Sequence, residues 1–131
     1  MSVRLFIASL IALAIGAAVY AANPGDAAAG KAYFTQTCRQ CHSVEPGDGG
    51  GEIGPSLIGV FGRTAGVGDT RFAYSNALAD SKLVWNAETL GRFLTDPATT
   101  VPGTTMALPI PAKPDRDNVI AYFQSLASGA K

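Results

Sequence analysis

Apolar residues are concentrated at the start of the chain, where 16 of the 18 positions in residues 5–22 are apolar. A basic residue, Arg4, precedes this stretch, and small residues stand at its end. This order is typical of a secretory signal peptide, so we expect residues 1–21 to be cleaved after Ala21 and residues 22–131 to form an exported, periplasmic domain. The alternative is a retained inner-membrane anchor facing the periplasm, because about 18 apolar residues reach the lower limit of a bilayer span.

Beyond this stretch, the apolar positions recur at helical spacing. Asp26 and Asn86 are suited to cap two of the helices, and Pro97 should end the second of these because proline disfavours a helical conformation at the preceding residue. Residues 97–114 hold five Pro and should form an extended loop. No alternation of period two indicates a strand, so the predicted fold class is all-α. The predicted helices cover residues 27–38, 74–82 and 87–95, and a last helix begins at Pro114.

Residues 43–68 are too rich in Gly and Pro for regular helix or sheet. A loop of this length in a small domain usually has a function or packs on a bound group. The chain has ten Lys plus Arg and ten Asp plus Glu, without a basic cluster. A nucleic-acid-binding protein needs a basic face for the phosphates, so this composition excludes that class.

The run from Cys38 to His42 is a C-x-x-C-H motif. Two thiols at this spacing, followed by His, are typical of haem attachment: Cys38 and Cys41 form thioethers and His42 is an axial iron ligand. A dithiol redox site would normally lie in a βαβ unit, and a zinc site needs about four ligands. A structural disulfide would leave His42 unexplained. The motif therefore favours a covalently bound haem.

The residue counts restrict the second iron ligand. His42 is the only His of the chain, and Met106 is the only Met besides the initiator. A six-coordinate His/Met iron therefore has one possible assignment. An isolated Met is more often a core residue, but a nearby haem and a Pro/Gly-rich loop over residues 102–106 favour a ligand here.

With these motifs, four further segments resemble class I cytochrome c, in its short mitochondrial and bacterial periplasmic form. They are residues 54–63, residues 72–75, Trp85 and residues 102–106. The resemblance covers residues 26–128 and implies the cytochrome c fold, in which terminal helices cross and loops wrap one covalently bound haem c.

The resemblance also implies roles for particular side chains. The carbonyl of Pro55 should accept a hydrogen bond from the non-ligating nitrogen of His42. Gly30 and Phe34 should pack against the last helix through Tyr122. Four residues should hold the haem propionates: Arg63, Tyr74, Trp85 and Thr104.

This sequence departs from the family pattern at three positions near the haem. Phe93 stands where many relatives have Tyr, and Leu108 stands where mitochondrial forms have Phe. Thr105 replaces a Lys, and the remaining lysines are too scattered to form a basic ring. A docking mode based on that ring is therefore not expected.

The implied function is electron transfer without enzymatic activity. A monohaem carrier would shuttle single electrons between respiratory or photosynthetic partners, such as a quinol-oxidising complex and a terminal oxidase or reductase. One alternative is a gas- or peroxide-reactive haem protein in which Met106 dissociates, but no acid–base pair stands beside Met106 for peroxide cleavage. Another is a tethered subunit of a larger oxidoreductase complex, held through residues 5–22.

Overall fold

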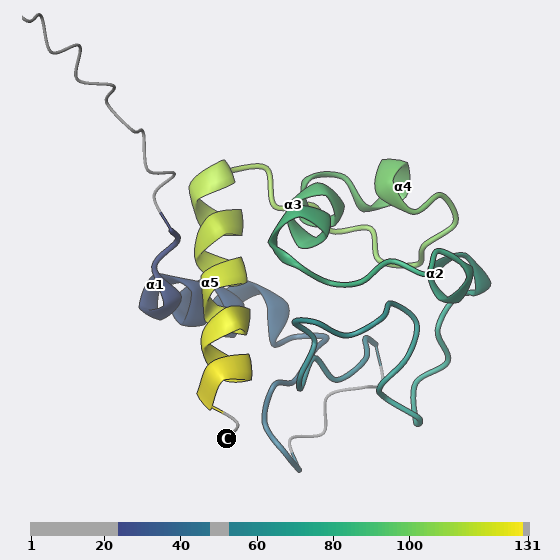
Figure 1. Ribbon diagram of the computed structural model, residues 1–131, viewed down its shortest axis with the longest axis horizontal. Helices are drawn as coiled ribbons and strands as arrows, with labels where there is room; N and C mark the ends of the chain where they lie inside the picture. The colour runs from purple at the N-terminus through teal and green to yellow at the C-terminus, as the bar shows by residue number, and fades with distance from the viewer. Residues whose placement is uncertain (1–23, 48–52, 130–131) are drawn as a thin grey trace, which may run out of the picture.

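The computed structural model describes residues 24–47 and 53–129, so the predicted signal peptide or anchor lies outside the described residues. Within these ranges the chain has no strand, and Thr64 and Val84 form an isolated bridge. No described helix is both long and apolar enough to cross a membrane. The all-α prediction is confirmed. The helical segments, in chain order, are α1 (Ala27–Tyr33), η1 (Phe34–Cys38), α2 (Asn76–Asp80), α3 (Ala87–Thr95), α4 (Pro97–Thr100) and α5 (Lys113–Gly129) (Figure 1).

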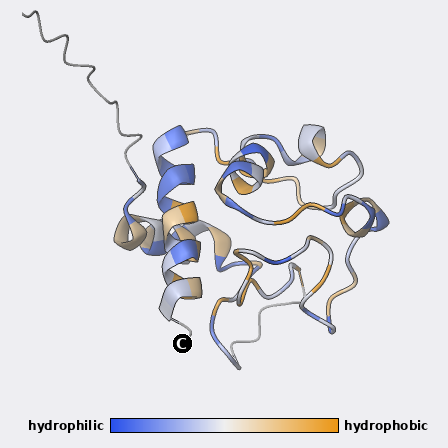
Figure 2. Ribbon diagram, viewed as in Figure 1, coloured by the Kyte–Doolittle hydropathy of each residue, from blue (hydrophilic) through white to orange (hydrophobic). Residues whose placement is uncertain are grey.

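The first and last helices cross each other, as the resemblance implies (Figure 1). Gly30 is buried at the crossing, where a Cβ atom would overlap the backbone carbonyl of Asn118. One turn later, the Phe34 ring lies 5.8 Å from the Tyr122 ring and 6.0 Å from the Phe123 ring. Hydrophobic residues of α5 lie in its middle turns, beside α1, whereas its first turns are hydrophilic (Figure 2). The absence of a side chain at Gly30 thus allows the two helices to approach closely, and the aromatic rings pack against each other beside this contact.

The helix predicted over residues 27–38 changes its geometry at Phe34. Its second half, η1, is a π-helix, in which the Arg39 N–H donates to the Phe34 carbonyl oxygen over 2.9 Å. The Thr35 hydroxyl donates to the Lys31 carbonyl oxygen, the acceptor that the Thr35 N–H would use in an α-helix. The wider turn ends at Cys38, so the change in pitch leads directly into the C-x-x-C-H motif that begins at this residue.

The middle helices begin at caps. Ser75 caps α2 by accepting from the Leu78 N–H, and α2 is shorter than predicted. Asn86 caps α3 in a reciprocal capping box with Thr89, so this predicted start is confirmed.

The prediction of a continuous loop over residues 97–114 is wrong at its beginning. Asp96 accepts from the Thr99 N–H and Pro97 occupies the first helical position, so the proline that ends α3 also starts the short helix α4. The last helix begins at Lys113, one residue before the predicted start.

The core lies between α1, α3 and α5 and extends beneath the loops. Trp85 packs on Phe93 with their ring centroids 5.0 Å apart. Met106 and Leu57 are partly buried against this core. The loops that carry the motifs are therefore anchored on the helices. The buried apolar side chains include Phe34, Val60, Trp85, Leu90, Phe93, Leu94, Val101, Ile110, Val119, Ile120, Tyr122 and Phe123.

Candidate functional site

A cavity of about 340 Å³ opens between the C-x-x-C-H segment and the loop that follows α4. It brings together residues from distant parts of the sequence, and none of its lining side chains is Lys, Arg, Asp or Glu. The cavity is therefore apolar, with sulfur and imidazole groups as its main functional groups. The lining residues are Thr37, Cys38, Cys41, His42, Ile53, Gly54, Pro55, Phe72, Leu94, Thr104, Thr105, Met106, Ala107, Leu108, Pro109 and Ile110.

Cys38 and Cys41 reach this cavity as free thiols. Cys38 ends η1, and its carbonyl oxygen accepts from the N–H groups of Cys41 and His42, at 3.1 and 2.9 Å. Burial, with a smaller contribution from neighbouring Cys41, raises the pKa of the Cys38 thiol to about 11. Both cysteines are half-buried, and the turn presents them with His42 to the same cavity.

The imidazole of His42 is held from behind by backbone groups. Its Nδ1 lies 2.7 Å from the Pro55 carbonyl oxygen, so the hydrogen bond expected from the resemblance is present. Gly54 lies against the ring, where a Cβ atom would come within 2.5 Å of Cε1. Burial lowers the pKa of His42, although the bond to Pro55 opposes this shift. The ring is therefore neutral at pH 7, with Nδ1 engaged and Nε2 left as a potential metal ligand.

Met106 reaches the cavity from a loop fixed at both ends. Gly103 has φ +93°, a left-handed conformation that favours glycine. Next to it, the Thr104 N–H donates to the Val101 carbonyl, and the Thr104 hydroxyl accepts from the Met106 N–H over 3.4 Å. At the far end, the Ile110 N–H donates to the Leu94 carbonyl over 2.7 Å. These bonds hold the thioether of Met106 against the cavity.

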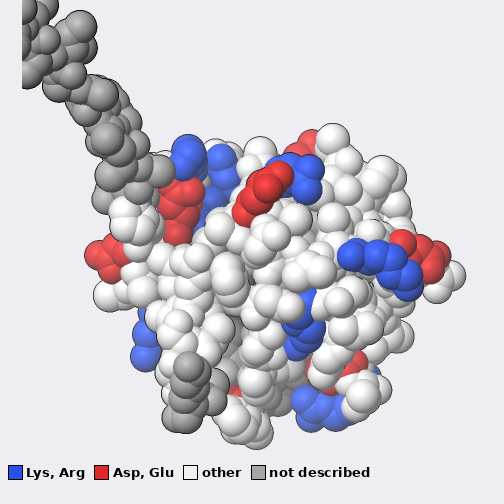
Figure 3. Space-filling model, in the orientation of Figure 1, with Lys and Arg blue, Asp and Glu red and all other residues white. Residues whose placement is uncertain are grey.

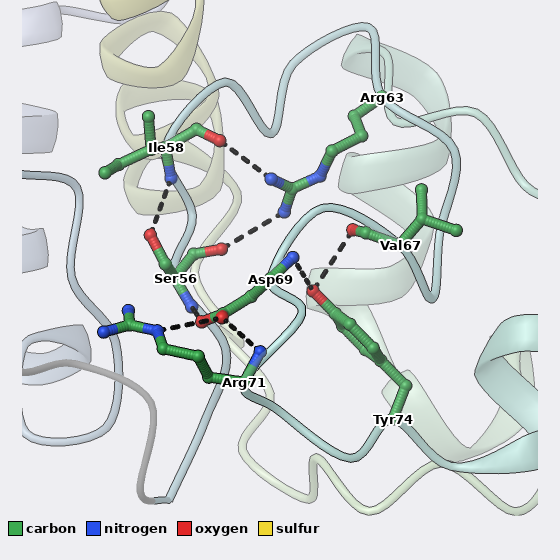
Figure 4. Close-up of polar contacts among 7 residues, drawn as sticks. All are labelled: Ser56, Ile58, Arg63, Val67, Asp69, Arg71 and Tyr74. Carbon is green, nitrogen blue, oxygen red and sulfur yellow. Dashed lines mark hydrogen bonds and ion pairs between the residues drawn. The ribbon is translucent and has the colours of Figure 1, made fainter. Parts of the chain in front are cut away.

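The structure places the four residues predicted to hold propionates in different surroundings. Thr104 lines the cavity, whereas Arg63, Tyr74 and Trp85 are not among its lining residues. Trp85 is buried, and its backbone N–H donates to the Arg63 carbonyl oxygen. The Tyr74 hydroxyl donates to the Val67 carbonyl and accepts from the Asp69 N–H (Figure 4). Their roles toward a haem stay predictions.

The guanidinium of Arg63 has an unused donor that is buried. Its terminal nitrogens donate to the carbonyl oxygens of Ile58 and Ser56, at 2.8 and 3.2 Å (Figure 4). Its Nε is, among the described residues, the one buried side-chain nitrogen or oxygen without a hydrogen bond. An unsatisfied buried donor is costly, so this nitrogen fits an acceptor group of a bound molecule.

Sequence reasoning missed one buried polar residue near this site, Asp69. Its carboxylate accepts from the Ser56 N–H over 2.9 Å and from the Arg71 N–H over 3.0 Å (Figure 4). A single Asp within a Gly-rich loop has no periodicity or motif, so nothing in the sequence distinguishes it from a solvated loop charge.

The donor set fits an iron porphyrin. No cluster of three or more His, Cys, Asp or Glu that could hold a bare metal ion occurs in residues 24–47 and 53–129. Instead, two thiols, one neutral imidazole and one thioether face an apolar cavity, and outside its lining the buried Nε of Arg63 has no hydrogen-bond partner. Thiols suit covalent attachment, and imidazole with thioether suits axial ligation. This combination defines the class of c-type cytochromes.

Comparison with known proteins agrees with this class. The family model for cytochrome c matches residues 27–127. Cytochrome c of Euglena viridis is 46% identical over 103 residues, which cover 78% of this chain and 98% of that protein. Cytochrome c2 of Rhodoblastus acidophilus is 44% identical over 109 residues, which cover 82% of this chain and 99% of that protein. The solved structure of cytochrome cH from Methylobacterium extorquens matches with a TM-score of 0.69 and 42% identity, covering 77% of this chain and 99% of that one.

The chain therefore belongs to the cytochrome c family. It is a monohaem electron-transfer protein that binds one covalently attached haem c, and it is not an enzyme. Its partners are redox proteins. The gas- or peroxide-reactive protein and the subunit of a larger complex, considered above as alternatives, are not favoured.

Proposed function

We propose that this cytochrome is an exported single-electron carrier whose haem is bonded to Cys38 and Cys41 and ligated by His42 and Met106. One observation carries the proposal: a single uncharged cavity collects both thiols, the imidazole and the thioether. The haem, when bound, supplies a reversible one-electron couple between ferric and ferrous iron. An iron held by both His42 and Met106 would have no position open for a substrate.

The protein side chains set the properties of this couple. The hydrogen bond from Nδ1 to Pro55 fixes the orientation of the His42 ring and leaves Nε2 for the iron. A thioether ligand from Met106 raises the potential relative to a second nitrogen ligand. The apolar lining disfavours the additional positive charge of the ferric state, which acts in the same direction.

Four polar residues are proposed to hold the haem propionates: Arg63, Tyr74, Trp85 and Thr104. The unused buried Nε of Arg63 and the position of Thr104 at the cavity support this role. A propionate carboxylate would accept from this free donor in a charge-assisted hydrogen bond.

The proposed location is the periplasm, with residues 1–21 removed after Ala21 and residues 22–131 forming the carrier. The basic residue, apolar stretch and small residues at the N-terminus support export. The proposed partners are a quinol-oxidising complex and a terminal oxidase or reductase. The intact mass of the purified protein tests this part: a chain starting at Ala22 with one added haem supports a cleaved carrier, whereas a chain starting at Met1 or Ser2 supports a membrane tether.

The substitution Met106→Ala tests the iron ligation. We expect the ferric variant to lose the sulfur-to-iron charge-transfer band in the red, because no other described Met can replace the thioether. Leu108→Ala is the matched control, since Leu108 lines the same cavity without a ligating group, and it should keep the band. An unchanged spectrum for Met106→Ala would contradict the ligand assignment.

A further inference from the structure

A buried carboxylate outside the cavity connects to His42 through one peptide group. The Asp69 side chain is 4% exposed although it lies in a surface loop. Its Oδ2 accepts from the Ser56 N–H over 2.9 Å. Ser56 directly follows Pro55, whose carbonyl oxygen lies 2.7 Å from Nδ1 of His42. The Ser56 N–H and the Pro55 carbonyl are the two ends of the same peptide group.

This arrangement forms a continuous series of hydrogen bonds from an anion to the imidazole. A peptide group that donates to a carboxylate becomes polarised, so its carbonyl oxygen is a stronger acceptor. A stronger acceptor at Nδ1 increases the electron density at the opposite nitrogen, Nε2. Asp69 can therefore act on the imidazole without touching it.

Neighbouring residues hold Asp69 and Ser56 in place (Figure 4). The Tyr74 hydroxyl accepts from the Asp69 N–H over 3.1 Å, which fixes the backbone at the carboxylate. A terminal nitrogen of Arg63 donates to the Ser56 carbonyl over 3.2 Å, which fixes the chain directly after the Pro55–Ser56 peptide group. The geometry therefore depends on several independent bonds.

The carboxylate keeps its charge at neutral pH. The backbone N–H of Ser56, followed by that of Arg71, lowers the pKa of Asp69 below its ordinary value. The Arg71 side chain is a weak counter-ion, because its Nε lies 3.5 Å from Oδ1 and the side chain is 73% exposed. Solvent therefore screens most of its attraction, and the negative charge acts on the Pro55–Ser56 peptide.

We propose that Asp69 is a positioning residue that strengthens His42 as an electron donor through the Pro55–Ser56 peptide and so lowers the reduction potential of the iron. A more electron-rich imidazole stabilises the ferric state relative to the ferrous state. This inference rests on the proposed function, in which His42 ligates the iron. A carboxylate that served only to hold two loops together would leave the potential and the imidazole unchanged.

Asp69→Asn in the haem-loaded protein tests the relay, with Asp80→Asn as the control. Asp80 is exposed at the end of α2, and its substitution removes the same formal charge. We expect Asp69→Asn to shift the reduction equilibrium about threefold further toward ferrous protein than Asp80→Asn, because charge-assisted hydrogen bonds are roughly twice as strong as neutral ones. Spectroelectrochemical titration measures this shift.

A second readout follows the imidazole directly. In the ferrous, diamagnetic protein, the His42 Nδ1 proton resonance should move upfield in Asp69→Asn and stay in place in Asp80→Asn. Equal potentials for the two variants, with an unchanged Nδ1 resonance, would overturn the proposal even if Asp69→Asn were less stable. The red charge-transfer band of the unmodified protein tests the proposed function separately from the relay, since its absence would contradict the ligation of the iron by Met106.

Arg71→Ala supplies an independent test in a protein that keeps Asp69. Removing the exposed counter-ion leaves the bond between Asp69 and Ser56 in place, so the Nδ1 resonance should move downfield, opposite to Asp69→Asn. Arg92→Ala, an exposed residue on α3, controls for the loss of a positive charge. An Nδ1 resonance that is equal in these two variants would also overturn the relay.

Discussion

Two glycines show how much depends on single missing side chains. Gly30 allows α1 to touch the backbone of α5, and Gly54 allows the chain to lie against the His42 ring. Any side chain at Gly30 would meet the Asn118 carbonyl, which is backbone and has little room to move. Gly91, in the middle of α3, differs from both because its nearest neighbour to an added Cβ would be Ile120 Cδ1 at 3.9 Å.

Alanine substitutions at Gly30 and Gly91 should therefore have opposite effects. Gly30→Ala should lower the free energy of unfolding by about 3 kcal/mol, because an overpacked contact forces the two helices apart. Gly91→Ala should raise it by about 1 kcal/mol, since alanine has the better helix propensity and meets only ordinary contacts there. Guanidinium unfolding of the haem-loaded proteins measures both values. Destabilisation of similar size at the two sites would contradict the packing argument.

At the scale of elements, Asp96 joins two helices. It is the C-terminal cap of α3 and the N-terminal cap of α4, where Oδ2 accepts from the Thr99 hydroxyl over 2.7 Å. Hydrogen bonds from the hydroxyl and then from the N–H of Thr99 lower the pKa of the Asp96 carboxyl. This junction directs the chain from α3 into the loop that carries Met106.

The stability that Asp96 supplies should depend on pH. Its folded pKa lies below the unfolded value of about 3.9, so its contribution is full above that pH and is lost as the pH falls through the folded pKa. Asp96→Asn keeps one acceptor oxygen but cannot ionise. The difference in unfolding free energy between the unmodified protein and Asp96→Asn should therefore be greatest near pH 7 and should shrink as the pH falls through the folded pKa.

Urea unfolding across this pH range provides the measurement, and Asp80→Asn controls for the loss of a negative charge. A difference that stays constant, or grows, as the pH falls would show that the charge of Asp96 does not stabilise the junction.

The elements that the sequence predicts well are those with local signals. Asn86 and Asp26 cap α3 and α1 as expected, because a capping side chain bonds to backbone only two or three residues away. The π-helical turn begins at Phe34, beside a bond from the Thr35 hydroxyl to the Lys31 carbonyl, and α4 depends on one Asp beside one Pro. Neither the π-helical turn nor the short helix α4 produces a periodic pattern of apolar residues by which the sequence could predict it.

The same distinction applies to the site. The haem-binding motif is contiguous, and Met106 is the only Met besides the initiator. The sequence alone is therefore enough to name Cys38, Cys41, His42 and Met106 as candidates. Asp69 could not be found in this way, because its partner Ser56 lies 13 residues away and only the folded loops bring the two together. Tertiary contacts of single polar residues therefore become visible only in the folded chain.

The charge of the whole molecule is balanced and dispersed. Ten basic and ten acidic residues give no net formal charge, and on the face shown in Figure 3 the two signs are interspersed. The cavity itself has no charged lining residue, and two of its apolar residues, Ile53 and Leu108, are 72% and 62% exposed. A redox partner that approaches the cavity therefore meets an apolar, uncharged surface.

This charge distribution predicts electron transfer with little dependence on salt. Oxidation of the ferrous protein by anionic hexacyanoferrate(III) or by cationic tris(phenanthroline)cobalt(III) should change by less than about twofold between low and physiological ionic strength, because steering requires a local charge that salt can screen. Stopped-flow absorbance measures both rates. A steep salt dependence of opposite sign for the two oxidants would show that a charged patch controls access.

A lysine at the cavity should make the oxidation rates depend on ionic strength. Thr105 is exposed and lines the cavity, so Thr105→Lys places a positive charge where an oxidant approaches. At low ionic strength this variant should react faster with the anionic oxidant and more slowly with the cationic one. Ala98 is exposed on α4 and does not line the cavity, so Ala98→Lys adds the same charge and should change both rates less. Equal effects of the two lysines would mean that net charge, rather than the surface around the cavity, determines the encounter.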